Sequence, residues 1–539
     1  MWGIERKNLI RILQPCVVAL FALAAACGGG SSGFAGTSPP PPPPPPPGGS
    51  GWEPGVFLDW STFQNLCQSP RSGTDPATGQ PFLDLQGETL EENNFLRSYS
   101  NDTYLWYDEI VDQDPGLFDD PLVYFEELRT TALTPSGAPR DKFHFTFPTD
   151  EWFQLSQSGV SAGYGATWAV LSPSPPREVA VAYTEPNSPA TNLPVPIARG
   201  ARILSVDGVD VINGTDVDTI NGGLFPAGPG ETHAFEVLDL DSQTSRTVQL
   251  TSAEITSAPV QNVSFVDTPT GRVGYMLFND HILTAENALV DAVNQLNTFG
   301  IDDLVVDVRY NGGGFLFIAS QLAYMIGGPA QIAGRPFETL EFNDQHPITD
   351  PVTGQPIEPM PFYAVTLDGA SLPVLDLPIR RVFVLTGPGT CSASESIMNG
   401  LRGVDVEVIQ IGSTTCGKPY GFYPTDNCGT TYFTIQFRGV NAKNFGDFGD
   451  GFSPENTDPT GIVGTVVPGC SVGDDFSSQL GDPTEARFAA AMQYRDTGIC
   501  PAATGAGVPG MNKLGAFTAP SDGVIFKNPF LTNRILRRP

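Results

Sequence analysis

Apolar residues between positions 256 and 480 follow two alternating patterns. Short runs rich in β-branched residues, such as Val273 to Phe278 and Leu304 to Val308, predict buried strands. Segments with an apolar residue every three or four positions predict helices, and the clearest begins after Thr284 and stops at Gly300. Further strands are expected at Val382 to Leu385 and Val404 to Ile411, and further helices at Phe315 to Ile326 and Ser394 to Leu401. This alternation predicts an α/β domain with a mixed, partly parallel sheet and flanking helices, whose loops at the strand ends carry any chemistry.

Two other modules are expected before this α/β domain. Residues 56–155 favour a helical N-terminal domain, because one set of mostly aromatic residues keeps helical spacing: Phe95, Leu96, Tyr99, Thr103, Trp106, Tyr107 and Ile110. Residues 156–255 contain short β-branched runs separated by Gly, Pro and Asp, which predicts a small β-rich module. Residues 481–539 are predicted to be a C-terminal extension.

The first 55 residues have the pattern of an export segment followed by a tether. Basic residues precede an apolar run from Pro15 to Ala26, so residues 1–26 are interpreted as a signal peptide. Leu23 to Cys27 resembles a bacterial lipobox, in which the Cys27 thiol would carry lipid; plain secretion is the alternative. Residues 27–55 are rich in Gly, Ser and Pro, and Pro39 to Pro47 favour a stiff polyproline II spacer. We expect a bacterial cell envelope protein, in the periplasm or at the outer membrane, that meets a membrane only through this anchor.

Composition excludes several classes of function. The chain has 28 Lys and Arg against 59 Asp and Glu, a formal charge of −31, which argues against a nucleic-acid partner. Four scattered His, with neither HExxH nor CxxC, argue against a zinc enzyme.

An exported location permits disulfides. Six cysteines follow Cys27, and six cysteines allow about 15 connectivities. Proximity in the sequence alone favours Cys416 with Cys428 and Cys470 with Cys500.

Three motifs are candidates for the site that carries the chemistry. Gly159 to Gly163 spells the GxSxG of α/β-hydrolases around Ser161, but no strand is expected before it and no helix after it. Gly412 to Lys418 nearly spells a phosphate-binding loop, yet Pro419 stands where a magnesium-binding Ser or Thr is needed.

The third motif joins Lys418 to a serine-rich segment, Thr390 to Glu395, between a predicted strand and a predicted helix. Amides at a helix start can stabilise an oxyanion, and a lysine can act as a base where burial disfavours its charged form. Ser-Lys pairs are a known variant of the serine triad. The alternative is a helix-capping serine and an ordinary surface lysine.

The order of these segments resembles the carboxyl-terminal processing proteases, also called tail-specific proteases. These are serine peptidases with a Ser-Lys pair and usually a PDZ domain. The resemblance is carried by Gly274-Tyr-Met-Leu-Phe278, Asp307-Val-Arg-Tyr-Asn-Gly-Gly-Gly314, Ser392-Ala-Ser-Glu395, Gly417-Lys418 and Gly449-Asp-Gly-Phe-Ser-Pro-Glu455. It implies that Ser392 is the nucleophile, Lys418 the general base, and the amides of Gly313 and Ala393 the oxyanion hole. Ser394 would be structural, and no metal or organic cofactor is required.

The β-rich module also fits this resemblance. Arg199 to Gly208 looks like a PDZ strand motif, and Gly163 to Ala166 looks like the loop that binds a peptide carboxylate, with Tyr164, Gly165 and Ala166 as contacts. Strand addition there would capture unstructured C-terminal tails. A generic β-hairpin is the alternative.

The sequence departs from the family at three positions near the pair. Phe422 stands where a glutamine commonly orients the lysine, and Gln436 is a possible substitute. Cys391 and Cys416 flank the two catalytic candidates and suggest active-site loops braced by disulfides. The sequence as a whole predicts an exported serine endopeptidase; the alternatives are an inactive peptide-binding relative or an esterase using Ser161.

Overall fold

A six-stranded sheet forms the centre of the α/β part. The computed structural model describes residues 51–75, 78–461, 463–502, 522–526 and 534–535, so the predicted signal peptide, Cys27 and the polyproline run lie outside the described residues. The sheet has the order β12-β13-β14-β17-β18-β25. Its strands are β12 (Val260–Thr268), β13 (Gly271–Phe278), β14 (Asp303–Asp307), β17 (Arg381–Thr386), β18 (Glu407–Gly412) and β25 (Gly469–Ser471). All neighbours are parallel except β12 and β13, which confirms the mixed, partly parallel sheet.

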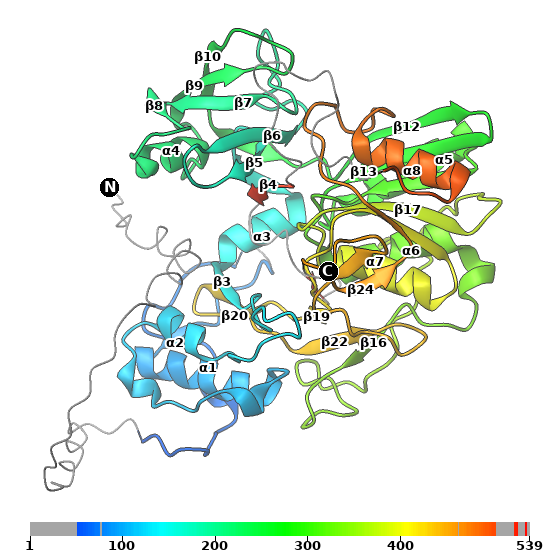
Figure 1. Cartoon of the computed structure of the whole chain (residues 1–539). Helices are drawn as coiled ribbons and strands as arrows, with labels where there is room; N and C mark the ends of the chain where they lie inside the picture. Colours follow the sequence, from blue (N-terminus) through cyan, green and yellow to red (C-terminus); the bar gives the residue numbers. More distant parts are fainter. Residues whose placement is uncertain (1–50, 76–77, 462, 503–521, 527–533, 536–539) are drawn as a thin grey trace, which may run out of the picture. The chain divides into compact units, whose positions relative to one another are not determined.

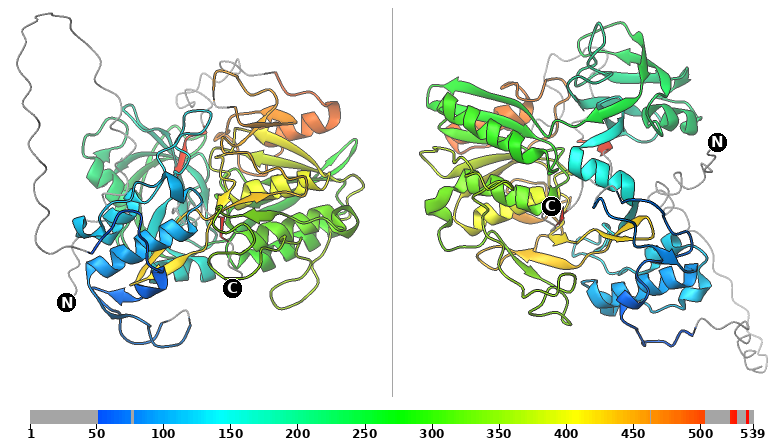
Figure 2. Two further views of the ribbon diagram at one scale, coloured as in Figure 1. Left: turned by 90° about the horizontal axis from the view of Figure 1, so that it is seen from below. Right: turned by 180° about the vertical axis from the view of Figure 1, so that it is seen from behind.

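Helices cover both faces of this sheet. Three crossover helices, α5 (Ala285–Phe299), α6 (Leu316–Ile332) and α7 (Ala393–Gly403), share one hydrophobic core with Leu304 and Val306 of β14. The intervening residue Val305 belongs to a second core with Phe488 of α8 (Ala486–Thr497). Because successive side chains of a strand point to opposite faces, α8 lies on the other side from α5, α6 and α7. Figures 1 and 2 show this arrangement, with α8 in orange.

The periodic patterns located most of these elements. Helix α5 buries Leu289, Val293 and Leu296 and ends at Gly300, whose φ of 65° is readily adopted by glycine. Strand β18 begins at Glu407, later than the predicted Val404, because Val404 is the C-cap of α7.

The β-rich module is built on one twisted sheet of order β10-β9-β7-β6-β5-β26, with β8 paired to β7. Its strands are β5 (Ala166–Ser172), β6 (Glu178–Thr184), β7 (Arg202–Val206), β8 (Val209–Asp210), β9 (Thr232–Leu238), β10 (Arg246–Thr251) and β26 (Val524–Phe526). Helix α4 (Val217–Leu224) packs on it through Ile220 and Leu224, against Trp168 and Phe235. Strand β4 (Val160–Gly163) pairs separately with β11 (Ala253–Thr256).

The N-terminal segment contains α1 (Thr89–Thr103), α2 (Pro121–Glu127) and α3 (Thr149–Ser158), together with β1 (Leu66–Cys67), β2 (Leu85–Gln86) and short 3-10 turns. Phe95, Leu96 and Tyr99 are buried as expected. The prediction of one helical face reaching Ile110 is wrong, because α1 ends at Thr103. Tyr104 is extended, and the N–H of Leu105 pairs with the carbonyl of Ile435, so tertiary contacts end the helix.

Small sheets connect the remaining segments. They are β3 (Phe145–Pro148) with β21 (Thr430–Phe433) and β20 (Thr425–Asn427), β16 (Thr339–Glu341) with β22 (Phe437–Val440) and β19 (Tyr420–Gly421), β23 (Phe452–Pro454) with β24 (Thr465–Val467), and β15 (Gly314–Phe315) with β27 (Arg534–Ile535).

Three disulfides are present in the described part of the chain. They join Cys67 to Cys428, Cys391 to Cys416, and Cys470 to Cys500. The pair Cys470–Cys500 was expected from proximity. The expected pair Cys416–Cys428 is wrong, because the folded loops place each of these cysteines beside a partner that proximity in the sequence did not indicate. The Cys391–Cys416 bond confirms that a disulfide braces the predicted active-site loops.

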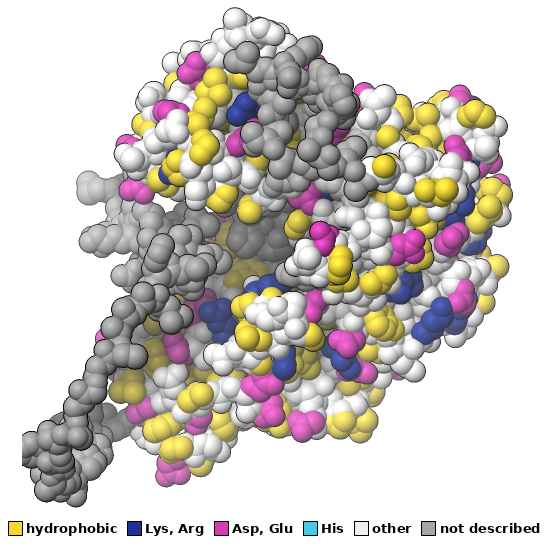
Figure 3. Space-filling view, viewed as in Figure 1, with side chains coloured by type: hydrophobic (Ala, Val, Ile, Leu, Met, Phe, Trp, Pro, Cys, Tyr) yellow, Lys and Arg dark blue, Asp and Glu magenta, His cyan; other side chains and the backbone are white. Residues whose placement is uncertain are grey.

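Within the residues searched, none of the helices is both long enough and apolar enough to cross a bilayer. In Figure 3 the Lys and Arg side chains on the face in view lie among acidic ones and do not merge into a continuous basic surface.

One buried histidine makes stability depend on pH. The His144 ring stacks on the Phe125 ring, with 3.8 Å between the ring centroids, and its Nε2 lies 2.8 Å from the backbone carbonyl oxygen of Phe125. Burial lowers the pKa of His144 from 6.5 to about 4, against the opposing effect of Asp141. The unfolded chain therefore binds this proton more readily than the folded chain between those two values, so the free energy of unfolding falls as pH decreases through that window. The full effect is about 3 kcal/mol.

Urea unfolding at pH 7 and pH 4.5 measures this loss. Relative to the wild type, His144→Gln is expected to lose less stability on acidification. The partly exposed His346→Gln serves as the matched control and is expected to keep the wild-type pH dependence. Equal pH dependence in wild type and His144→Gln would contradict the assignment.

Candidate active site

Three loops meet at one edge of the central sheet. They follow β14, β17 and β18, which are parallel neighbours. Because the carboxyl ends of parallel strands lie at the same edge, residues 308–314, 387–392 and 413–418 are brought together there. These loops hold the predicted glycine run, Ser392 and Lys418.

Asn311 joins the first of these loops to the second. Its carbonyl oxygen accepts hydrogen bonds from the Cys391 N–H at 3.1 Å and from the Ser394 hydroxyl at 3.0 Å. Its side-chain oxygen accepts the N–H of Gly313 at 3.0 Å, and its amide nitrogen donates to the Phe278 carbonyl at 3.0 Å. Asn311 is buried and connects the two loops, and the structural role of Ser394 stays a prediction.

A buried ionic network holds the base of the first loop. Arg309 contacts the carboxylates of Asp307, Asp474 and Glu485 at 2.7–3.0 Å, and all four side chains are essentially inaccessible. Arg199 of the β-rich module also donates to Asp474, at 2.6 Å. Burial alone would raise the pKa of the Asp474 carboxyl. The neighbouring Arg199 and Arg309 guanidinium groups outweigh this effect and hold the pKa of Asp474 below its usual value. Removing one member would leave an uncompensated buried charge, so the network fixes the loop rigidly.

Ser392 occupies the N-cap of α7 in a strained conformation. Its φ is 61° and ψ −116°, a combination that non-glycine residues rarely adopt. The side chain is buried, and within the described residues its hydroxyl oxygen has no hydrogen-bond partner. Strain of this kind persists where the surroundings hold a residue in place, which makes Ser392 a candidate functional residue.

Glu395 holds the serine and lysine segments together. One oxygen of its carboxylate, Oε2, accepts the backbone N–H of Ser392 and the backbone N–H of Lys418, each at 2.8 Å. The other, Oε1, accepts the Gly417 N–H at 2.9 Å and the Thr415 hydroxyl at 2.5 Å. The backbone nitrogens of Ser392 and Lys418 are therefore separated by no more than the sum of two hydrogen-bond lengths. Two residues 26 positions apart in sequence are thus close neighbours.

This carboxylate is completely buried. Burial raises the pKa of Glu395, while hydrogen bonds from Thr415 and from the backbone N–H groups of Lys418, Ser392 and Gly417 lower it. The four donors are those a carboxylate anion requires in a dry environment.

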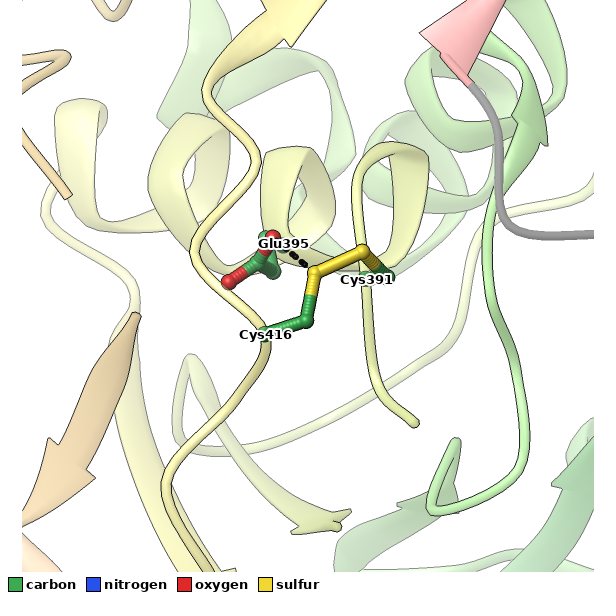
Figure 4. Close-up of side chains that lie close together, drawn as sticks. All are labelled: Cys391, Glu395 and Cys416. Atoms are coloured by element: carbon green, nitrogen blue, oxygen red, sulfur yellow. Dashed lines mark hydrogen bonds between the residues drawn. A yellow bond between two sulfur atoms is a disulfide. The ribbon is translucent and has the colours of Figure 1, made fainter. Parts of the chain in front are cut away.

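The Cys391–Cys416 disulfide lies against Glu395, as Figure 4 shows. The two sulfurs and the carboxylate are grouped closely enough to suggest metal ligands. Metals bind cysteine as the thiolate, and a disulfide offers none, so the oxidised group is a covalent brace for the loops.

Lys418 is fully buried between two aromatic rings. Its Nζ lies 4.6 Å from the centroid of Phe143 and 4.5 Å from that of Phe422, the residue that replaces the family glutamine. The side-chain oxygen of Gln436 accepts the Tyr423 N–H, and its amide nitrogen donates to the Tyr99 hydroxyl. The sequence therefore located Lys418 but missed Phe143, which comes from the N-terminal segment.

Gly417 allows the lysine loop to pack closely. Its φ is 80°, and a Cβ there would come within 2.2 Å of the Gly449 carbonyl oxygen. Phe452 continues the contact, because its N–H donates to the Thr415 hydroxyl at 2.7 Å. The late glycine-rich block thus supports the loop that carries Lys418.

The predicted oxyanion donors lie in these loops. Among the residues that the structure describes, the N–H groups of Ala393 and Gly312 donate no hydrogen bond, whereas the Gly313 N–H is engaged by Asn311. Gly313 has a φ of 106°, and Gly314 has a φ of 135°. Within the described part of the chain, the Gly312 N–H is therefore not engaged in this conformation, whereas the Gly313 N–H is.

The loop resembling a PDZ carboxylate site is integrated in the β-rich module. Tyr164 is buried and its hydroxyl donates to the Gly223 carbonyl at 2.9 Å, while the Gly165 carbonyl accepts the Glu185 N–H at 2.7 Å. Ala166 begins β5. Ser161 lies exposed in β4, after helix α3 and before β5, which reverses the strand-turn-helix order of a nucleophile elbow.

Two further residues, Glu395 and Lys142, make contacts at this site that the sequence did not predict. Glu395 was visible in the sequence as the last residue of the serine block, but its contacts with the lysine loop were not. Lys142, which donates from Nζ to the Cys416 carbonyl at 2.9 Å, comes from a segment with no recognisable motif.

Known proteins match the fold and part of the sequence of this chain. The chain has the fold of a solved "Putative S41 protease" from Bacteroides fragilis, with a TM-score of 0.55, 21% identity, and coverage of 75% of this chain and 97% of the other. Residues 272–421 match peptidase family S41 and therefore form a peptidase S41 domain.

A curated relative, the "Carboxyl-terminal-processing protease" of Picosynechococcus sp., is 29% identical over 233 residues. The match covers 42% of this chain and 49% of the relative, so the chain spans about half the length of that protein. These findings confirm the resemblance to carboxyl-terminal processing proteases. The PDZ assignment stays a prediction.

Proposed function

We propose that this protein is a serine endopeptidase in which Ser392 is the nucleophile and Lys418 the general base. One observation carries the proposal: a single oxygen of Glu395 accepts the backbone N–H groups of both residues. The Cys391–Cys416 disulfide joins the same two segments a second time. A structural serine and a surface lysine would need neither connection.

The reaction uses the groups at this sheet edge. The neutral amine of Lys418 takes the proton of the Ser392 hydroxyl as the oxygen attacks a peptide carbonyl, and the protonated amine then supplies a proton to the leaving amine. Water, activated by the same amine, hydrolyses the acyl-enzyme. The N–H of Ala393 and a glycine N–H of the Gly312–Gly313 pair stabilise the oxyanion. Gly313 can take that part only after it separates from Asn311.

The surroundings of Lys418 act on its charge in opposite directions. The two phenyl rings exclude water and disfavour the ammonium, while their faces attract a cation.

The substrates are polypeptides, cleaved near unstructured C-terminal tails. The name of the curated relative supports this substrate class, and strand addition to the sheet of the β-rich module is a way to bind such a tail. We interpret residues 156–255 as a PDZ-like domain and residues 56–155 as a helical N-terminal domain that supplies Phe143.

Export to the cell envelope completes the proposal. It rests on the signal-peptide pattern of residues 1–26 and on Cys27, and three disulfides suit an oxidising compartment.

Labelling with a serine-directed fluorophosphonate, followed by mass-spectrometric mapping, tests the assignment alongside a cleavage assay on an unstructured polypeptide. Cleavage together with labelling at Ser392 is expected. Labelling at Ser161 would favour an esterase, and neither cleavage nor labelling would favour an inactive peptide-binding relative.

A further inference from the structure

The C-terminal segment of the chain is added as a strand to the β-rich module. Strand β26 pairs antiparallel with β5, with Val524 opposite Val170 and Phe526 opposite Trp168. Because β6 pairs with the other side of β5, β26 occupies its outer edge. Following β26 toward its C-terminal end leads toward the beginning of β5, where Gly163 to Ala166 lie.

Asp522 fastens this strand to the S41 domain. Its carboxylate pairs with Arg487 of α8, accepts the Ser413 hydroxyl, and accepts the Asp474 N–H at 2.9 Å. Arg487 is buried, so this ion pair is shielded from water. Gly523, with a φ of 65°, then turns the chain beside Leu171, where a Cβ would come within 2.7 Å of a methyl group.

A second piece of the same segment reaches the candidate active site. Strand β27 pairs parallel with β15, where Arg534 is opposite Gly314 and Ile535 opposite Phe315. Gly314 directly follows the proposed oxyanion glycines. Strand β27 also lies against β19, which begins two residues after Lys418. The backbone of residues 534–535 therefore lies beside both proposed catalytic loops.

Charge favours the same docking. From position 522 to the end, the chain has four basic residues, Lys527, Arg534, Arg537 and Arg538, and one acidic residue, Asp522. The whole chain carries −31. A basic segment is attracted electrostatically to a chain that is acidic overall.

We propose that the C-terminal segment containing β26 and β27 is a tethered competitor of substrate. It occupies two strand edges, on β5 and on β15, that a polypeptide would otherwise use on its way to Ser392. This inference rests on the proposed function, since the competitor matters only where a polypeptide is processed. A strand that belongs to the same chain loses little translational and rotational entropy when it binds. A substrate therefore displaces it only with a higher effective concentration or affinity.

The first test compares the full chain with a chain that ends at Pro520. Carboxymethylated casein, an unstructured polypeptide, is the substrate. Removal of the segment is expected to raise kcat/KM at least about tenfold, mainly through KM, and a synthetic peptide of residues 521–539 is expected to inhibit the shortened chain competitively. Unchanged or lower kcat/KM, with the peptide failing to inhibit, would overturn the proposal.

A binding experiment makes the result independent of catalysis. The fluorescent 521–539 peptide is added to Ser392→Ala chains of both lengths, and anisotropy is measured. Binding to the shortened chain but not to the full chain supports the tethered competitor even if Ser392 proves not to be the nucleophile. Equal binding to both chains, or to neither, contradicts it.

A substitution in the full chain guards against misfolding of the shortened one. Asp522→Ala removes the Arg487 and Ser413 contacts and is expected to increase hydrogen exchange along β5 and to raise kcat/KM. Asp458→Ala is the matched control, because the hydrogen bonds that its carboxylate accepts from described residues come from Thr460, within a local turn. Faster exchange along β5 without any gain in kcat/KM would show a purely structural strap and reject the proposal.

Discussion

Ser392→Ala and Lys418→Met are each expected to lower kcat by roughly 10⁴- to 10⁶-fold, because each removes one half of a unit that must act together. The folded state should persist, since neither side chain is part of the central sheet. Cleavage of carboxymethylated casein gives the rate, and circular dichroism with thermal unfolding gives the fold. The double variant is expected to lose little more than either single one.

The chain provides matched controls for both residues. Ser394→Ala removes a neighbouring hydroxyl that donates to the Asn311 carbonyl, and Lys142→Met removes a second lysine that contacts the Cys416 carbonyl. Both should retain most of the activity, within about tenfold of wild type, because each loses one hydrogen bond to a backbone carbonyl and no group that acts on substrate. If Ser394→Ala or Lys142→Met were the inactive variant and its neighbour remained active, the pair would be reassigned.

The sheet was predictable because its signal is local. Buried runs such as Leu304 to Val308 and the stripe on α5 report their own burial, and alternation of the two periods leaves few topologies. The end of α1 was not predictable, because Trp106 and Tyr107 keep helical spacing while tertiary pairing of Leu105 with Ile435 stops the helix. Periodicity predicted the burial of Phe95, Leu96 and Tyr99, but it did not predict where tertiary contacts end the helix.

The sequence predicted Ser392 and Lys418 as the candidate pair, but it did not predict the contacts that hold their segments together. Ser392 and Lys418 stand in recognisable motifs in the expected order. A glutamate three positions after a helix-capping serine has the pattern of a capping box, which accounts for only one of the bonds that Glu395 accepts. Its other partners lie at Thr415, Gly417 and Lys418, and only the folded chain brings that loop back to α7. The same reasoning explains why proximity in the sequence gave the wrong partner for Cys416.

Glu395→Gln tests whether this carboxylate positions the pair. Glutamine has the same shape but offers one acceptor oxygen where the carboxylate offers two. Its NH₂ group must therefore face one of two donor pairs: the N–H groups of Ser392 and Lys418, or the Gly417 N–H and the Thr415 hydroxyl. One buried donor pair is left unsatisfied, at about 1–3 kcal/mol for each group. We expect kcat to fall roughly 10²- to 10³-fold, which corresponds to about 3–4 kcal/mol of transition-state stabilisation, with KM little changed.

Glu286→Gln is the matched control. Glu286 is also buried in the S41 domain, where it accepts the Gln321 amide at 2.6 Å and the Leu367 N–H at 2.9 Å, away from the three loops. Both variants should lose stability in thermal unfolding, but only Glu395→Gln should slow fluorophosphonate labelling of Ser392 and shift the pH profile of kcat/KM, because only it lets the serine and lysine segments separate. Equal losses of activity in the two variants would reduce Glu395 to a contributor to stability. Reduction of the Cys391–Cys416 disulfide should then aggravate the Glu395→Gln defect, since that bond is the second connection between the same two segments.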